Sequence, residues 1–178
     1  MASVREVLDF WFEENGPAEW FQKNDGFDGK VRERFLPTYR SAVAGELDMW
    51  RVSGEGRLAE ILVLDQFSRN MFRDKAEAFS ADALALCLAQ WAVSVKADQE
   101  IAKERRSFLY MPYMHSESST VHEAAVELFR PFPQTYDYEL KHKAIIDRFG
   151  RYPHRNAILG RESTVEEAEF LQTPGSSF

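Results

Sequence analysis

The sequence predicts an all-α protein built from antiparallel helical hairpins. Apolar residues recur every three or four positions along most of the chain, which is the spacing of one helix face. Short breaks rich in glycine and proline separate the helical stretches, and short connections favour antiparallel neighbours. No stretch alternates apolar and polar residues over the length of a strand. We therefore expect one helical domain over residues 1–178, arranged as a bundle or as a tetratricopeptide-like α-solenoid with a degenerate repeat.

The first helices are expected from capping boxes and breakers. Ser3 and Glu6 form a capping box ahead of a helix that stops at Gly16-Pro17. Residues 25–28 are expected to form a turn, and the next helix follows over residues 31–43, kinked by Pro37. An amphipathic helix is expected over residues 57–73, and an alanine- and leucine-rich helix over residues 78–96.

The C-terminal helices are shorter and more often interrupted. A helix near residues 101–110 should stop at Pro112, and a second capping box, Thr120 with Glu123, should open the next one. Residues 141–149 are expected to be helical up to Gly150. Ser163 or Thr164 caps a last helix.

Composition excludes several classes of protein. The one cysteine, Cys87, rules out an internal disulfide, and it lies in a helix expected to belong to the core. The first ten residues contain no apolar signal segment, so we expect a cytoplasmic protein. The net charge of −7 argues against nucleic-acid binding, and the longest apolar run, residues 83–95, is too short to span a membrane. No glycine loop, dinucleotide pattern or zinc spacing indicates a cofactor or a metal.

Three polar motifs interrupt the apolar pattern. The first spans residues 65–73, where the polar residues fall on one helical stripe: Asp65, Gln66, Arg69, Asn70 and Arg73. A solvated face with an Asp65–Arg69 ion pair, which contributes about 0.2–0.5 kcal/mol, would explain this stripe. Ligand binding is the alternative, because Gln and Asn are poor choices for a merely soluble face and lie beside two arginines.

The second motif is expected to lie on a turn between helices. His115 and Glu117 follow Pro112 and precede the next helix, a position at which loops aim functional side chains. His115 could act as a general base, as a donor to an anion, or with Glu117 as half of a metal site, although His-x-Glu alone is a weak metal motif. Binding of backbone groups at the turn is an equally good interpretation.

The third motif is a basic segment in an acidic chain. Residues 141–161 contain six Lys or Arg against one acid, Asp147, together with His142 and His154. His142 shares a helical face with apolar residues and is best interpreted as a core histidine. An excess of positive charge is typical of a site for an anion, and a helix beginning near His154 would add backbone N–H donors. The members expected to bind a ligand are Arg148, Arg151, Arg155 and Asn156.

These motifs also resemble a known family, the bacterial DUF924 proteins. The resemblance is carried by residues 64–73, residues 110–117 and residues 148–164, and less strongly by residues 7–12 and 45–50. It implies a tetratricopeptide-like helical fold and leaves the activity open. Many members carry proline where this chain has Ser68, and the change is expected to make the helix more regular.

Three functions are compatible with these patterns. In the first, the motifs line a cavity for a small anionic phosphate or carboxylate compound, with Gln66, Arg69, Asn70, Arg73 and the third motif as ligands. His115, Glu117 and His154 would then be the candidate catalytic residues of an enzyme of undetermined reaction. In the second, a helical groove binds a peptide. In the third, the arginines pair with acids in an ionic network that joins the helices. The oligomeric state is not predicted.

Overall fold

The computed structural model describes residues 1–177, and over that range every element is helical, which confirms the all-α prediction. Its contacts group the chain into two compact units. Unit 1 comprises Met1–Arg73 and Glu77–Pro112, and unit 2 comprises Asp74–Ala76 and Tyr113–Phe178. The expectation of a single domain and that of a solenoid arrangement stay predictions.

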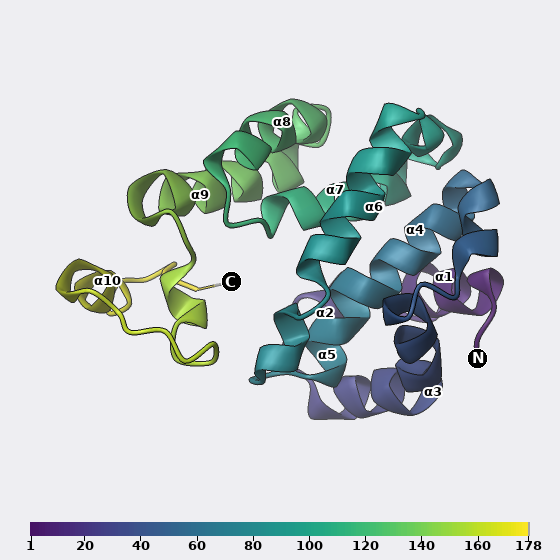
Figure 1. Cartoon of the computed structure of the whole chain (residues 1–178), viewed down its shortest axis with the longest axis horizontal. Coiled ribbons are helices and arrows are strands. Elements are labelled where there is room, and N and C mark those ends of the chain that lie inside the picture. The colour runs from purple at the N-terminus through teal and green to yellow at the C-terminus, as the bar shows by residue number, and fades with distance from the viewer. Residues whose placement is uncertain (178) are drawn as a thin grey trace. The chain divides into compact units, whose positions relative to one another are not determined.

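Unit 1 is formed by helices α1 to α6 and most of α7 (Figure 1). The helices are α1 Val4–Phe12, α2 Pro17–Trp20, α3 Asp25–Val43, α4 Gly54–Leu62, α5 Ser68–Met71, α6 Asp82–Ser94 and α7 Lys103–Met114. Three 3₁₀ segments connect them: η1 Asp48–Val52, η3 Ala76–Phe79 and η4 Ala97–Glu100. A π-helical turn, η2 Val63–Phe67, joins α4 to α5.

Aromatic side chains from separate elements form the core of unit 1. Phe10 of α1, Phe35 of α3 and Phe67 of η2 are each at most 1% exposed. The Phe10 and Phe35 ring centroids lie 4.9 Å apart, and those of Phe35 and Phe67 lie 4.7 Å apart. Tilted aromatic pairs at this distance contribute beyond the area that they bury, so this cluster fixes α1 and α3 against the π-helical turn.

The local predictions for unit 1 are partly confirmed. The Ser3–Glu6 capping box forms, and the chain leaves α3 through Gly45 at a φ of 75°. Residues 25–28 are helical rather than a turn, because the Asn24 side chain caps α3 by accepting the Phe27 N–H. Pro112 lies inside α7 instead of ending it.

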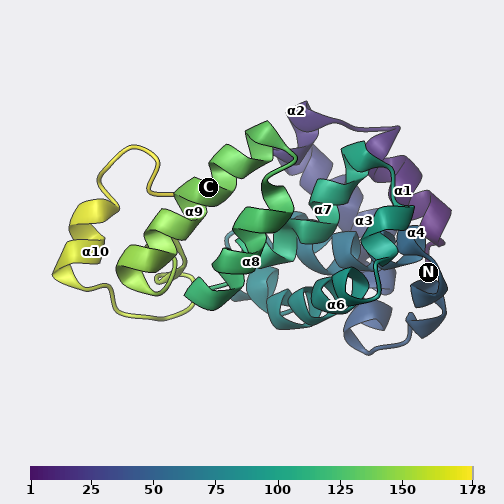
Figure 2. The same cartoon turned by 90° about the horizontal axis from the view of Figure 1, so that it is seen from above.

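Unit 2 contains the C-terminal helices. They are α8 Ser119–Phe129, α9 Pro133–Phe149, the 3₁₀ segment η5 Pro153–Arg155, and α10 Val165–Phe170. The short connection between α8 and α9 makes them an antiparallel hairpin, and the two helices lie side by side in Figures 1 and 2. Ile145, Ile146 and Tyr152 form its buried core, with Phe149 and Phe170 packed against them.

The capping predictions for unit 2 had mixed outcomes. Gly150 ends α9 at a φ of 69°, and Thr164 caps α10 with a capping box to Glu167, as predicted. The Thr120 capping box is wrong, because α8 already begins at Ser119 and its N-cap residue is Ser118. No long helix begins near His154; only the three-residue η5 forms there.

Candidate functional site

The polar stripe of the first motif is buried. Asp65 is fully buried, and Gln66 and Asn70 are 8% and 5% exposed. Residues 63–67 adopt a buried π-helical turn instead of the regular helix that the sequence predicted. The interpretation of these residues as a solvated face is therefore wrong.

Side-chain donors fill the irregular turn. The Asp65 carbonyl oxygen accepts hydrogen bonds from Ser68 Oγ at 3.0 Å and from Arg69 Nη1 at 2.8 Å. Ser68 is fully buried and also lies 3.2 Å from the Ala78 carbonyl oxygen. Buried backbone carbonyls need partners, so these two side chains stabilise the π-helical turn.

Carboxylates engage both arginines of the first motif. Arg69 donates to both Asp82 carboxylate oxygens, at 2.9 and 3.0 Å. Arg73 and the Asn70 amide both donate to Asp28 of α3, with Arg73 Nε 2.5 Å from Oδ2. These are the contacts of an ionic network, which the third alternative predicts for this motif. All the site residues predicted from the first motif lie together in unit 1.

The second and third motifs meet in unit 2. Glu117 lies on the predicted turn between α7 and α8, and its carboxylate receives both Arg161 Nη atoms, at 2.6 and 2.9 Å. It also accepts the Tyr152 N–H at 2.7 Å. Burial alone raises the pKa of Glu117, but the Arg161 and Tyr152 hydrogen bonds and the charges of Arg161 and Arg155 lower it overall. Glu117 is therefore held ionised and fixes the loop after η5.

Tyr152 stands at the centre of a histidine cluster. The chain has four histidines, and all lie in unit 2 near this ring. His142, His154 and His122 have ring centroids 5.7, 5.6 and 6.4 Å from that of Tyr152, and His115 lies 6.5 Å from His142.

Arg155 belongs to the same cluster. Its guanidinium lies over the Tyr152 ring at 4.7 Å and donates to the His115 carbonyl oxygen at 3.1 Å. The residue is only 6% exposed. The structure thus brings together His115, Glu117, His154 and Arg155, which the sequence had placed in two separate motifs.

A fully buried acid–base pair lies behind this cluster. His122 Nδ1 is 2.6 Å from Glu139 Oε1, and both side chains are inaccessible to solvent. His122 Nε2 faces the Ser116 carbonyl oxygen at 2.9 Å and the Tyr152 hydroxyl at 3.2 Å. Because a carbonyl only accepts, the contact with Ser116 assigns a proton to Nε2.

Burial raises the pKa of Glu139, although His122 opposes the shift. The second carboxylate oxygen, Oε2, has no hydrogen-bond partner. A carboxylate in that position is poorly solvated, so the neutral acid is favoured over the anion relative to water. The Tyr152 hydroxyl completes the chain of contacts by donating to the Met114 carbonyl oxygen at 2.6 Å.

His142 is a buried histidine, as its helical spacing indicated. Its Nδ1–H donates to the Tyr138 carbonyl oxygen at 2.8 Å, and the residue is 7% exposed. Burial lowers its pKa to about 3, the hydrogen bond to Tyr138 opposes this, and the other three histidines lower it further. His142 is therefore neutral at physiological pH.

The remaining members of the third motif bind acids or the neighbouring loop. Arg151 donates to both Glu167 oxygens, at 2.6 and 2.8 Å, and lowers the pKa of Glu167 to about 2. Arg148 pairs with Glu166 at the surface, where both side chains are more than half exposed. Asn156 is buried and donates to Ser163 Oγ at 3.0 Å.

Sequence reasoning missed the His122–Glu139 pair and the central place of Tyr152. A signal was present, because the two residues lie on opposite sides of the Pro131–Pro133 break, nine residues before Pro131 and six after Pro133. An antiparallel hairpin brings such positions face to face.

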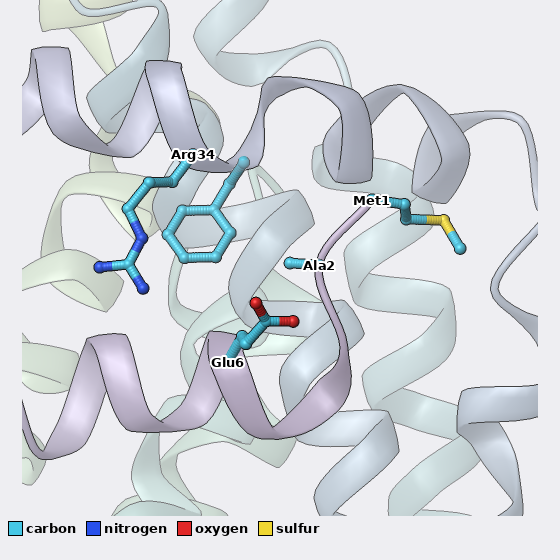
Figure 3. Close-up of a pocket in the computed structure, with 5 residues that line it drawn as sticks. Met1, Ala2, Glu6 and Arg34 are labelled. Carbon is cyan, nitrogen blue, oxygen red and sulfur yellow. The ribbon is translucent and has the colours of Figure 1, made fainter.

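Other candidate sites are weaker. A small hollow of about 220 Å³ in unit 1 is lined by Met1, Ala2, Glu6, Arg34 and Phe35 (Figure 3). It is smaller than the roughly 300–1,000 Å³ of typical ligand sites and contains none of the predicted site residues. Within residues 1–177, no cluster of three or more His, Cys, Asp or Glu residues is placed to hold a metal ion. No helix in the same range has the length and apolar character needed to cross a membrane.

Comparisons with known proteins identify the family. Residues 7–175 match the model of a bacterial protein family of unknown function, DUF924. A solved structure of a protein of unknown function, ATU0120 from Agrobacterium tumefaciens, is 38% identical with a TM-score of 0.91 and covers 95% of this chain and 96% of that chain. No curated protein is significantly similar in sequence. The chain belongs to the DUF924 family, as its three motifs indicated.

Proposed function

We propose that this member of the DUF924 family binds a small anionic molecule, a phosphate or carboxylate compound, at the cluster around Tyr152 in unit 2. The observation that carries the proposal is the gathering of His142, His154 and the Arg155 guanidinium around the Tyr152 ring, with the His115 ring 6.5 Å from that of His142. Guanidinium and imidazole N–H groups are the donors that recognise phosphate and carboxylate oxygens.

Charge supports an anion over a cation as the ligand. The segment that supplies Arg155 and His154 has six basic residues against one acid. The nearest acid of the turn, Glu117, already receives Arg161 and the Tyr152 N–H. Because its pKa is lowered, Glu117 is ionised, so it binds the loop and does not donate a proton.

The proposal also assigns roles to the other predicted residues. His115 and His154 are the groups that would move protons if the bound molecule is converted, because an imidazole ring can both donate and accept a proton. Arg151 and Asn156 hold the loop through Glu167 and Ser163. Gln66, Arg69, Asn70 and Arg73 maintain the π-helical turn of unit 1.

The test is calorimetric titration with inorganic phosphate, pyrophosphate and citrate, on the wild type and on Arg155→Ala. Loss of a charged hydrogen bond costs about 1.5–3 kcal/mol, so we expect the variant to bind at least about tenfold more weakly while staying folded. Arg130→Ala is the matched control, since it removes one exposed arginine of unit 2 that pairs only with Glu127 at the surface.

Two outcomes would contradict the proposal. If Arg155→Ala and His115→Ala bind as tightly as the wild type, or if no anion binds the wild type, the cluster is not an anion site. Binding of a peptide carboxylate with no binding of the small anions would favour the interaction-module alternative.

A further inference from the structure

The Tyr152 side chain, around which the proposed anion site gathers, is held at both of its ends. At the backbone end, Glu117 accepts the Tyr152 N–H at 2.7 Å, and Arg161 donates to the Tyr152 carbonyl oxygen at 3.1 Å. At the other end, the hydroxyl oxygen lies 2.6 Å from the Met114 carbonyl oxygen and 3.2 Å from His122 Nε2. Because Tyr152 is fully buried, these contacts and the surrounding packing decide where the face of the ring lies.

The two contacts of the hydroxyl run in opposite directions. A hydroxyl has one proton, and the Met114 carbonyl, which can only accept, receives it. The contact with His122 therefore requires Nε2–H to donate to the hydroxyl oxygen. The Ser116 carbonyl oxygen, 2.9 Å from the same nitrogen, also requires the proton on Nε2. The Tyr152 hydroxyl is thus bound by only one orientation of the imidazole, the one that directs Nε2–H toward it.

Glu139 of α9 fixes His122 of α8 in that orientation. Glu139 Oε1 lies 2.6 Å from His122 Nδ1, so Nδ1 is engaged and Nε2 faces the hydroxyl of Tyr152. A partner on one ring nitrogen sets which way an imidazole points and where its proton lies. Both side chains are inaccessible to solvent, so water does not compete for either nitrogen.

The His122–Glu139 pair is a poor device for stability alone. Within residues 1–177, Glu139 Oε2 is buried without a hydrogen-bond partner. A buried polar atom without a partner costs free energy, and apolar side chains of similar volume often stabilise a core as well as a buried pair does. Stability alone therefore does not account for this pair, whereas a fixed donor to the Tyr152 hydroxyl does.

The Tyr152 ring in turn sets the position of the groups that would bind the anion. The Arg155 guanidinium lies 4.7 Å from the ring centroid, over the face of the ring. The ring centroids of His142 and His154 lie 5.7 and 5.6 Å from that of Tyr152. Binding groups need support from residues that lock their geometry, so a displaced Tyr152 ring would spread these donors apart.

From these contacts we propose that His122 and Glu139 are positioning residues of the anion site, which fix the Tyr152 hydroxyl and, through its ring, the Arg155 guanidinium. The inference rests on the proposed function, because the two residues have this role only if the cluster binds an anion. Neither residue touches the ligand, and both act through Tyr152. Both lie outside the three polar motifs of the sequence.

A double-mutant cycle tests the route through the hydroxyl, with calorimetric titration of inorganic phosphate, pyrophosphate and citrate. Tyr152→Phe keeps the ring and removes the hydroxyl, and His122→Asn keeps an amide near the position of Nδ1 but removes the donor to Tyr152. Each variant should bind about three- to tenfold more weakly, the effect of one neutral hydrogen bond. The double variant should bind no more weakly than either single one, because both remove the same contact. Losses that multiply would overturn the inference.

Conservative variants separate positioning from a purely structural role. His122→Gln places an amide near the position of Nε2, so it should bind anions more tightly than His122→Asn, although both lack the imidazole. Glu139→Leu should weaken binding, and Glu139→Gln, which can still hydrogen bond to His122 Nδ1, should restore most of it. Urea unfolding measures the stability of each variant. Affinities that follow stability instead of donor position would show a purely structural pair.

Tyr138→Phe is the matched control. It removes one tyrosine hydroxyl from unit 2 at a residue that is 55% exposed, so it should leave the anion affinity unchanged. If Arg155→Ala weakens binding but Tyr152→Phe and His122→Asn bind as the wild type does, the anion site stands and the positioning role is overturned. A wild type that binds none of the three anions would overturn the proposed function and this inference with it.

Discussion

Around the π-helical turn of unit 1, buried polar side chains meet as carboxylates and guanidiniums, whereas around Tyr152 in unit 2 they meet mainly as imidazoles. Asp28, Asp65 and Asp82 face Arg69 and Arg73 at hydrogen-bond distances. Carboxylates and guanidiniums ordinarily have pKa values far from neutral, whereas imidazole does not. In unit 2, by contrast, His122 Nδ1 lies 2.6 Å from Glu139 Oε1, and burial lowers the pKa of His142 to about 3.

Buried polar side chains therefore have two different roles in this chain. Paired permanent charges stabilise a helix irregularity, but they do not respond to pH or to an added anion. Imidazoles beside an arginine can donate to an added anion, and the lowered pKa of His142 makes stability depend on pH. We therefore expect substitutions in the two regions to change the free energy of unfolding by different amounts. We also expect its dependence on pH to differ between the two regions.

The largest effect is expected from His122→Ala. The substitution opens a cavity and leaves Glu139, whose Oε2 already has no hydrogen-bond partner, without its histidine. Loss of one partner of a buried pair costs about 3–5 kcal/mol, which urea unfolding would measure. Glu139→Gln, which keeps a side chain that hydrogen bonds to His122 Nδ1, should cost much less. Equal losses of unfolding free energy for the two variants would show that the His122–Glu139 pair does not stabilise the fold.

In unit 1 the corresponding substitution is Asp28→Ala. It removes the acceptor of both Arg73 and Asn70 and leaves their donors partly buried. Because Arg73 keeps some contact with solvent, we expect a loss of about 2–4 kcal/mol in urea unfolding. The surface pair Arg5–Asp9 offers the control, since Asp9→Ala should cost under about 0.5 kcal/mol. A similar small value for Asp28→Ala would mean that the network does not support the π-helical turn.

The pH dependence of stability should arise in unit 2. The pKa of His142 is about 3 in the folded chain against 6.5 for an ordinary histidine, so the unfolded state takes up a proton first as the pH falls. Stability from this group is present above pH 6.5 and falls by about 2 kcal/mol between pH 7 and pH 5. The raised pKa of Glu139 acts in the opposite direction.

His142→Asn isolates this contribution, because the Asn amide can donate to the Tyr138 carbonyl in place of Nδ1. The free energy of unfolding of the variant should vary less between pH 7 and pH 5 than that of the wild type. Parallel curves for the two proteins would show that His142 is not the source.

The smallest effects should come from the surface arginine of the third motif. Arg148→Ala breaks a pair in which both side chains are more than half exposed, and we expect a loss below about 1 kcal/mol. Arg151→Ala should cost more, because its partner Glu167 is 2% exposed and also caps α10. Thermal unfolding of both variants at neutral pH makes the comparison, and the reverse order would contradict it.

Much of the local structure was predictable because it depends on neighbours in the sequence. The capping boxes at Ser3 and Thr164 formed, and Gly150 ended its helix, since caps and glycine turns act within one helical turn. The helix end predicted at Pro112 and the capping box predicted at Thr120 were wrong, because tertiary packing outweighs weak local signals. The Asp65–Arg69 ion pair was expected and forms, whereas the pairing of Arg73 with Asp28 and of Arg151 with Glu167 was not expected.

By itself, the sequence determined that the chain is helical, where most helices begin and end, and to which family it belongs. The tertiary structure alone decided that residues 63–67 form a π-helical turn, that Glu117 receives Arg161, and that His122 faces Glu139. The physical reason is range. Helical periodicity and capping depend on residues close together in the sequence. The π-helical turn and these two contacts depend instead on how the helices pack.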